Sequence, residues 1–178
     1  GNVIGGGDWA KDRIVVDCIR AWINNKSVKI RCPDATRPWQ HVLEPLSGYL
    51  SLGHNLFLSN SLNGESFNFG PSFQVEKSVR VLIEDLALNW GFSNPKESYN
   101  VINEMPFHEA SLLKLDCTKA KNLLYWNQNL NYEQTINLIS DWYLTYRDNN
   151  QGLKEKTYDQ IKFYEENARE VSLPWAQN

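Results

Sequence analysis

The fold is decided by the stretch Arg37-Pro38-Trp39-Gln40-His41-Val42, taken together with Gly1-Asn2-Val3-Ile4-Gly5-Gly6-Gly7-Asp8-Trp9 at the start of the sequence. The first stretch reads as a short strand that opens with an arginine, whose charged planar fork matches phosphate oxygens. The second places an asparagine beside a glycine-rich turn. Together they bring a fixed cation and an amide to the meeting point of a strand and a turn, which suits an anionic ligand.

The chain has the size and composition of one folded domain. Its 178 residues can bury a substantial core, and 42% hydrophobic with 22% charged residues is an ordinary globular balance. The formal net charge of -3 gives no broad attraction to nucleic acid or anionic lipid. We therefore expect no nucleic-acid partner, and any phosphate must be bound by a few placed arginines.

Cysteine usage and hydropathy favour a cytoplasmic protein. Cys18, Cys32 and Cys117 are widely spaced without a Cys-x-x-Cys pattern, so we expect reduced thiols and no metal site. The longest apolar runs, such as residues 79–88, are interrupted by charge and too short to cross a membrane, and no signal-peptide pattern is present. We expect no membrane partner.

Apolar residues recur at helical spacing in several segments, and the clearest is 132–148, where Asn131 and Gln134 form a capping-box pattern. The charged segment 157–170 is expected to be either an exposed helix or a loosely held tail. The other expected helices cover 11–24, 44–59, a segment from Val75 to Leu86 that ends near Asn89 to Gly91, and 117–124.

Short alternating runs predict strands at Val28–Ile30, Trp39–Val42, Ser66–Gly70 and Leu112–Leu115, and we expect the first two to pair with each other. The sum is helices with several short strands, without the long strand–helix alternation of a complete nucleotide-binding sheet. The fold class is α/β, or α+β for this chain taken alone. We expect one lobe over 1–150 and a charged tail over 151–178.

The run Gly5-Gly6-Gly7 does not predict a phosphate loop, because it lacks the required spacing and Asp8 would repel a phosphate on those amides. The glycines permit either a left-handed backbone close to a ligand or an ordinary surface turn. We expect His41 to pack in or near the strand pair and His54 to lie on the surface. No catalytic triad or metal-ligand cluster can be assembled.

Carboxylates at Glu44, Asp85 and Asp116 fall on or beside expected helices. A solvated helix face or a helix cap explains them better than a catalytic pair does.

Four segments carry a resemblance to a known family: the two opening stretches, His108-Glu109-Ala110, and Leu115-Asp116 with Lys119-Ala120 and Trp126. They resemble the sugar-nucleotide-modifying branch of the extended short-chain dehydrogenase/reductase family, and most closely its 4,6-dehydratases. The resemblance covers nearly all of 1–150. It implies a substrate-binding lobe that lacks most of the Rossmann sheet, with the NAD-binding and catalytic residues in an amino-terminal half that this chain does not contain.

The resemblance also implies which residues bind substrate. Asn2 and Arg37 match the residues that contact the nucleotide diphosphate, and Arg13 is either a second cation or an exposed helical arginine. Ile30 and Arg31 align with the segment beside the nucleotide base. A sixth residue, His108, is either a hydrogen-bond donor to a phosphate oxygen or an ordinary loop histidine.

In the family, tightly held NAD oxidises the sugar at C4, water is eliminated across C5 and C6, and hydride returns to C6. The implied substrate is a CDP-sugar, CDP-glucose, and the complete enzyme is expected to be a homo-oligomer. This chain alone is expected to be inactive. Two alternatives stay open: a lobe of a related nucleotide-sugar epimerase or reductase, and a non-catalytic sugar-nucleotide-binding module.

Overall fold

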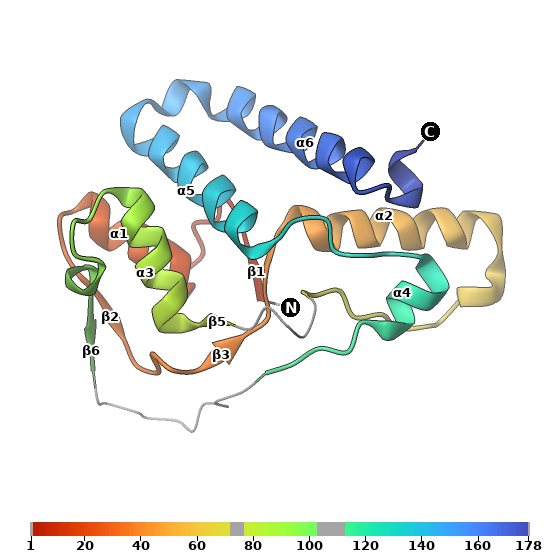
Figure 1. Ribbon diagram of the computed structural model, residues 1–178, viewed down its shortest axis with the longest axis horizontal. Helices are drawn as coiled ribbons and strands as arrows, with labels where there is room; N and C mark the ends of the chain where they lie inside the picture. The colour runs from red at the N-terminus through yellow and green to blue at the C-terminus, as the bar shows by residue number, and fades with distance from the viewer. Residues whose placement is uncertain (1, 72–76, 103–112, 178) are drawn as a thin grey trace.

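The computed structural model describes residues 2–71, 77–102 and 113–177, and it is built mainly from helices with short strands between them (Figure 1). In Figure 1, α1, α3 and α5 gather at one end, α2 and α4 lie at the other, and α6 runs across both. The helices are α1 (Ile14–Ile23), α2 (Leu43–Leu58), α3 (Val79–Trp90), α4 (Thr118–Leu124), α5 (Tyr132–Asp148) and α6 (Leu153–Glu170).

The helix predictions are largely confirmed. The α5 helix has the predicted bounds, and its capping box is present: Asn131 Oδ1 accepts from the Gln134 backbone N–H, and the Gln134 side chain accepts from the Asn131 N–H. The α3 helix begins later than predicted because Ser78 caps it by accepting from the Val81 N–H. Val75 lies outside the described residues.

The strands form three two-stranded pairs. The first pair joins β1 (Asn2–Ile4) to β4 (Trp39–His41), the second joins β2 (Val28–Ile30) to β6 (Tyr99–Val101), and both are parallel. The third pair, β3 (Thr36–Arg37) with β5 (Lys77–Ser78), is antiparallel.

The prediction that Val28–Ile30 pairs with the strand at Trp39 is wrong. A parallel partner must arrive through a long crossover connection, and each of these strands finds one elsewhere in the chain. Asn2 is in register with Trp39, and Val28 is in register with Tyr99. Three residues of strand are too few to specify a partner, so the pairing follows the helices that connect and cover them.

The predicted strand at Ser66–Gly70 is also wrong, because this segment has no regular secondary structure. The Phe69 carbonyl accepts from the Gln40 side-chain amide at 2.8 Å, and the Phe69 ring packs edge-on against Trp126. The described part of the predicted strand at 112–115, which is 113–115, is likewise irregular, and Leu112 lies outside the described residues.

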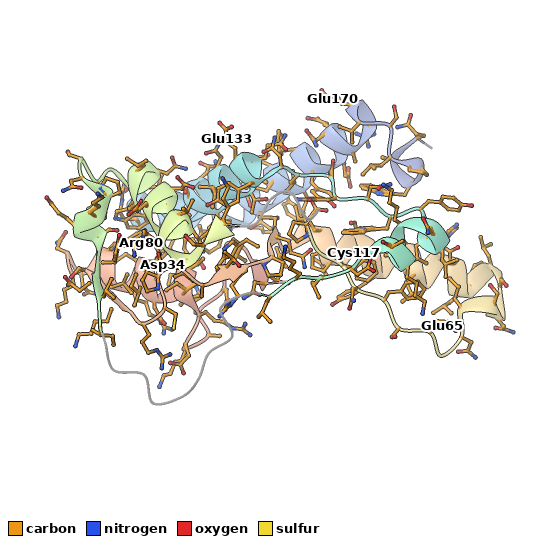
Figure 2. All side chains as sticks on the ribbon, turned by 60° about the horizontal axis from the view of Figure 1, so that its bottom comes forward. Asp34, Glu65, Arg80, Cys117, Glu133 and Glu170 are labelled. Carbon is orange, nitrogen blue, oxygen red and sulfur yellow. The ribbon has the colours of Figure 1, made fainter. Side chains whose placement is uncertain are left out.

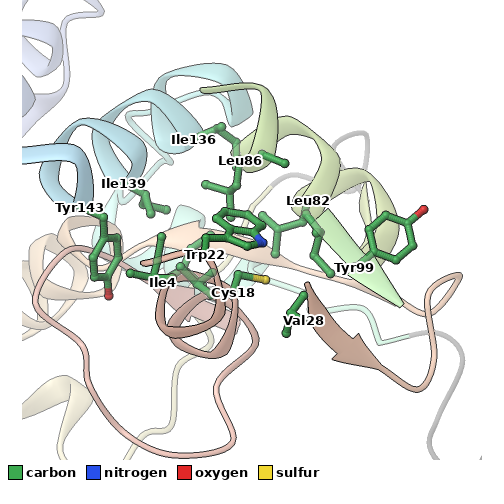
Figure 3. Packing of buried hydrophobic residues seen from close by; sticks show 14 of the residues in the cluster. Ile4, Cys18, Trp22, Val28, Leu82, Leu86, Tyr99, Ile136, Ile139 and Tyr143 are labelled. Carbon is green, nitrogen blue, oxygen red and sulfur yellow. The ribbon is translucent and has the colours of Figure 1, made fainter. Parts of the chain in front are cut away.

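The main core lies where α1, α3 and α5 meet the β1 and β2 strands, and Figure 3 shows Trp22 at its centre among aliphatic side chains from these elements. Cys18, Leu82, Ile83, Ile139 and Tyr143 are fully buried there. A smaller second core packs Phe69, Ala120, Leu124 and Trp126 beneath α2.

The tail segment is a helix. The sequence left a helix or a loosely held tail open for 157–170, and the structure has a helix there, α6. Tyr164 and Ala168 of α6 are buried, and the Gln160 side-chain amide donates to the Leu138 carbonyl at 2.7 Å. It therefore packs against α5 along its length.

The prediction that Glu44 lies on a solvated helix face or caps a helix is wrong. Its side chain is fully buried and does not cap α2. Its carboxylate accepts from the backbone N–H groups of Asn129 and Leu130 and from the Tyr164 hydroxyl. Burial raises the pKa of Glu44 to about 7, against the lowering effect of these hydrogen bonds. Through this carboxylate the first turn of α2 is joined to the segment before α5 and to α6.

His41 is buried in the β1–β4 pair, where the sequence predicts it to be. Its Nδ1 accepts from the Leu43 N–H at 3.3 Å, and burial lowers the pKa of His41 to about 4. His54 is exposed on α2, as predicted.

Candidate functional site

A cavity of about 260 Å³ opens between β1, the loop that follows it, the start of α1, and strands β2 and β3. Five of the six residues predicted to bind substrate line it: Asn2, Arg13, Ile30, Arg31 and Arg37. The sixth, His108, lies outside the described residues.

The parallel β1–β4 pair brings the two predicted diphosphate contacts together. The Asn2 N–H donates to the Pro38 carbonyl at 2.8 Å, so the start of β1 lies beside the residue that follows Arg37. Arg37 is only 5% exposed, and its Nη1 donates to the Thr36 carbonyl at 2.8 Å. A buried guanidinium held in this way is a fixed charge on the cavity wall, and its bidentate fork suits phosphate oxygens.

The charges around the cavity are divided by element. Strands β2 and β3 contribute the basic side chains of Lys29 and Arg37, and Arg31 follows directly after β2. The loop after β1 and the first turn of α1 contribute the carboxylates of Asp8, Asp12 and Asp17, with Arg13 among them. The cavity thus has a basic strand side and a largely acidic loop side.

The closeness of these carboxylates affects the ionisation of Asp17. Its pKa is raised, first by burial and then by the negative charge of Asp12, while Arg20 lowers it. The acidic side would repel an anion, so a phosphate-bearing ligand is expected to place its phosphates against the strands. Hydroxyl groups, which can donate to carboxylates, suit the loop side.

The connection between β2 and β3 is fixed on α3. Arg80 of α3 forms an ion pair with Asp34 at 3.1 Å, and Figure 2 shows the two side chains together. The Arg80 backbone N–H donates to the Pro33 carbonyl at 2.8 Å, and its Nη1 donates to the Tyr99 hydroxyl at 3.0 Å. These contacts hold the strand side of the cavity in place.

The glycine run is packed against other parts of the chain, and of its three residues only Gly5 lines the cavity. A Cβ on Gly6 would lie 2.1 Å from Cγ of Trp142, and a Cβ on Gly5 would lie 2.8 Å from Cγ1 of Val42. Gly7 has a φ of +81°, which confirms the left-handed backbone that the sequence allows. Gly5 thus permits a close approach to Val42, and Gly6 permits one to α5.

The neighbouring residue on α5, Tyr143, lines the cavity, and the sequence interpretation missed it. Its hydroxyl donates to the Asp8 carbonyl at 2.8 Å and lies 3.2 Å from the Gly5 carbonyl oxygen. The ring packs edge-on against Trp9 and Trp142. The helical period of 132–148 marks Tyr143 as a core residue, and nothing local in the sequence indicates its contact with a loop 138 positions earlier.

The described residues do not fit NAD. A dinucleotide site needs a glycine turn that leads directly from a strand into a helix N-terminus. Here α1 begins only at Ile14, and the Gly6 position is closed by Trp142. Tyr158 and Lys162 have the Tyr-x-x-x-Lys spacing, but both are exposed on α6 and neither lines the cavity.

The described ranges contain neither a metal-ligand cluster nor a helix that could cross a membrane. No group of three or more His, Cys, Asp or Glu side chains there could hold a metal ion. Among the helices of 2–71, 77–102 and 113–177, none is both long and apolar enough to span a bilayer.

Comparison with known proteins finds similarity in sequence and in fold. No protein-family model matches the chain. It is 43% identical over 143 residues to a CDP-glucose 4,6-dehydratase of Salmonella typhimurium, which covers 80% of this chain and 39% of that protein. The chain therefore spans about two fifths of the length of the curated relative that it matches.

Solved structures show the same partial coverage. A dTDP-glucose 4,6-dehydratase from Bacillus anthracis in complex with NAD superposes with a TM-score of 0.66 at 17% identity, over 86% of this chain and 45% of that one. A UDP-glucuronic acid 4-epimerase from Bacillus cereus gives 0.65 at 20% identity, over 81% and 43%.

The chain has part of the extended short-chain dehydrogenase/reductase fold. The predicted fold class and the predicted resemblance are thereby confirmed. Within that fold, the described residues supply the short strands, the helices around them and the cavity that they enclose.

Proposed function

We propose that this chain forms the nucleotide-sugar-binding part of an NAD-dependent 4,6-dehydratase, and that its substrate is CDP-glucose. The observation that carries the proposal is that Asn2, Arg13, Ile30, Arg31 and Arg37 line the same cavity. These residues lie far apart in the sequence, on β1, just before α1, at the end of β2 and on β3, and their common place around one cavity supports the proposal. The sequence similarity to a CDP-glucose 4,6-dehydratase supports the substrate class.

In this proposal different sides of the cavity bind the diphosphate, the base and the sugar of the ligand. Arg37 binds the diphosphate as a fixed buried charge, and the Asn2 amide donates to one of its oxygens. Ile30 and Arg31 flank the cytosine base. Aspartates of the loop side accept from sugar hydroxyls and so orient the sugar.

NAD would supply the hydride-transfer chemistry of such an enzyme. Because the described residues do not fit NAD, no catalytic step is assigned to this chain. We propose that the complete enzyme is a cytoplasmic homo-oligomer that forms CDP-4-keto-6-deoxyglucose, and that the 178-residue chain alone has no dehydratase activity.

Calorimetric titration of the 178-residue chain with CDP, UDP and GDP tests the proposal. We expect CDP to bind most tightly. Arg37→Ala should weaken CDP binding about 10- to 150-fold, which is the loss of one charge-assisted hydrogen-bonding group. Arg169→Ala removes an exposed arginine of α6 that does not line the cavity and serves as the matched control.

Arg37 is buried, so its replacement could also disturb the fold. Arg31→Ala provides a second variant, because Arg31 is exposed yet lines the same cavity. Equal affinity of the wild type, R37A and R31A for CDP would refute the site. Dehydration of CDP-glucose by the isolated chain would refute its inactivity.

A related epimerase is the second candidate, because the solved epimerase and the solved dehydratase superpose on this chain almost equally well. The fold therefore does not separate the two activities. Tighter binding of UDP than of CDP would favour the epimerase candidate over the dehydratase.

A further inference from the structure

The loop after β1 is held from one side by consecutive aromatic residues of α5. The Tyr143 hydroxyl donates a hydrogen bond to the Asp8 carbonyl, and the Gly5 carbonyl oxygen lies within hydrogen-bond distance of the same hydroxyl. The indole of Trp142 occupies the space beside Gly6, and Trp9 packs against Tyr143 and Tyr146 with ring centroids 5.5 and 4.7 Å apart.

Both carbonyls that face Tyr143 belong to residues that line the cavity. Gly5 and Asp8 form part of its loop side, and Tyr143 is itself a lining residue although it is fully buried. A shift of these two carbonyls would move the Asp8 side chain and the chain leading back to Asn2. The hydroxyl of Tyr143 is therefore placed to set the shape of the site without being in its open part.

The contact continues into α6. The Trp142 indole N–H donates to Thr157 Oγ1 at 3.0 Å, and the Thr157 hydroxyl in turn donates to the Leu153 carbonyl at 2.8 Å. Thr157 thus fixes the rotation of the indole that lies against Gly6. A helix that contributes no residue to the cavity is connected to it through two side chains.

We infer that Tyr143 is a positioning residue for the nucleotide-sugar site, and that Thr157 supports it by fixing the Trp142 indole against the glycine turn. The inference rests on the proposed function. It extends the site to residues that would not touch the ligand. Pre-organised loops raise affinity because binding then costs less conformational entropy.

Tyr143→Phe tests the inference, with Tyr132→Phe as the matched control. Tyr132 begins the same helix and donates to Asp85 Oδ2 at 2.8 Å, so each substitution removes one hydrogen-bonded phenol, but only Tyr143 contacts the loop. We expect Y143F to weaken CDP binding about 2- to 12-fold, the range for one neutral hydrogen bond. Y132F should bind CDP like the wild type.

Hydrogen exchange of the backbone amides in 5–9 supplies a readout that needs no ligand. We expect faster exchange in Y143F and in Thr157→Val, and wild-type exchange in Thr157→Ser, which keeps the hydroxyl that Trp142 needs. Unchanged exchange in Y143F would overturn the role of Tyr143, and equal exchange in T157V and T157S would overturn that of Thr157.

The outcomes separate this inference from the proposed function. If the wild-type chain does not bind CDP, the proposed function fails. If the wild type binds CDP and Arg37→Ala weakens binding but Y143F does not, the site stands and the positioning role is refuted. An equal loss of affinity in Y143F and Y132F would also refute it, because that result indicates general destabilisation.

Discussion

Trp142 and Gly6 are in such close contact that no side chain could be accommodated at position 6: a Cβ there would lie 2.1 Å from Cγ of the indole. The contact joins the first loop of the chain to α5, and the two residues lie 136 positions apart. Because the Trp142 ring is confined by Tyr143 and by its hydrogen bond to Thr157, it has little freedom to move away.

Gly6→Ala is therefore expected to destabilise the protein by about 1 to 3 kcal/mol, the usual cost of overpacking. The matched control is Gly53→Ala, since Gly53 lies inside α2 with nothing near its added methyl group, and alanine should stabilise that helix by about 0.5 to 1 kcal/mol. Urea unfolding of both variants gives the two free energies. Opposite signs are expected, and a neutral G6A would contradict the contact.

Glu44→Gln should change how stability depends on pH. The folded pKa of Glu44 is raised from 4.5 to about 7, so its contribution to the free energy of unfolding is fully present below pH 4.5 and is lost as pH rises to 7. The loss is about 3 kcal/mol for a shift of this size. Urea unfolding between pH 4.5 and 7 should show a smaller decline in E44Q than in the wild type.

The control for E44Q is Glu65→Gln, which neutralises an exposed carboxylate outside the buried network. It should leave the wild-type decline in place. If E44Q and E65Q gave the same pH profile, the buried carboxylate would not be the source.

His41→Asn should have the opposite effect. The folded pKa of His41 is lowered from 6.5 to about 4, so its contribution is present above pH 6.5 and is lost as pH falls to 4, again about 3 kcal/mol. Asn keeps an acceptor for the Leu43 N–H but does not titrate. The variant should lose less stability in acid than the wild type does.

The opposite signs of Glu44 and His41 have a practical result. Between pH 4.5 and 6.5 the two contributions offset each other, so the wild-type profile alone can look flat. Each variant must therefore be compared with the wild type at every pH. Parallel profiles for wild type and H41N would show that His41 does not titrate in this range.

Asn131→Ala should destabilise the protein by about 1 kcal/mol by removing the cap of α5. The Gln134 N–H would lose its acceptor, while no other part of the core is touched. A fall in the urea midpoint with an unchanged slope is the expected result. An unchanged midpoint would mean that the capping box contributes nothing.

Local signals account for what the sequence predicted well. The bounds of α5 follow from a cap at Asn131 and an uninterrupted helical period, both of which lie within one segment. Gly91 ends α3 with a φ of +108°, another feature that one residue type supplies. Such features depend only on residues that are close in sequence, so they can be predicted without knowing the tertiary structure.

Long-range contacts account for what it missed. Strands of two or three residues carry no information on their partners, so the parallel pairing of β1 with β4 could not be read from Val28–Ile30 or Trp39–His41. Glu44 looks like any first-turn carboxylate until Asn129 and Leu130 are seen to surround it. The predicted members of the cavity came from motifs, whereas Tyr143 carries no motif.

The hydrogen bond from Tyr143 to Gly5 can form only late during translation, because the two residues are synthesised at different times. At about 5 to 20 residues per second, the ribosome makes Tyr143 roughly 7 to 28 s after Gly5, since 138 positions separate them. Until then Gly6 lacks the Trp142 indole against which it packs, and the loop after β1 lacks its hydrogen bonds to Tyr143. A nascent chain that is interrupted before α5 would therefore carry the arginines and aspartates of the cavity on a loop that α5 does not yet hold in place.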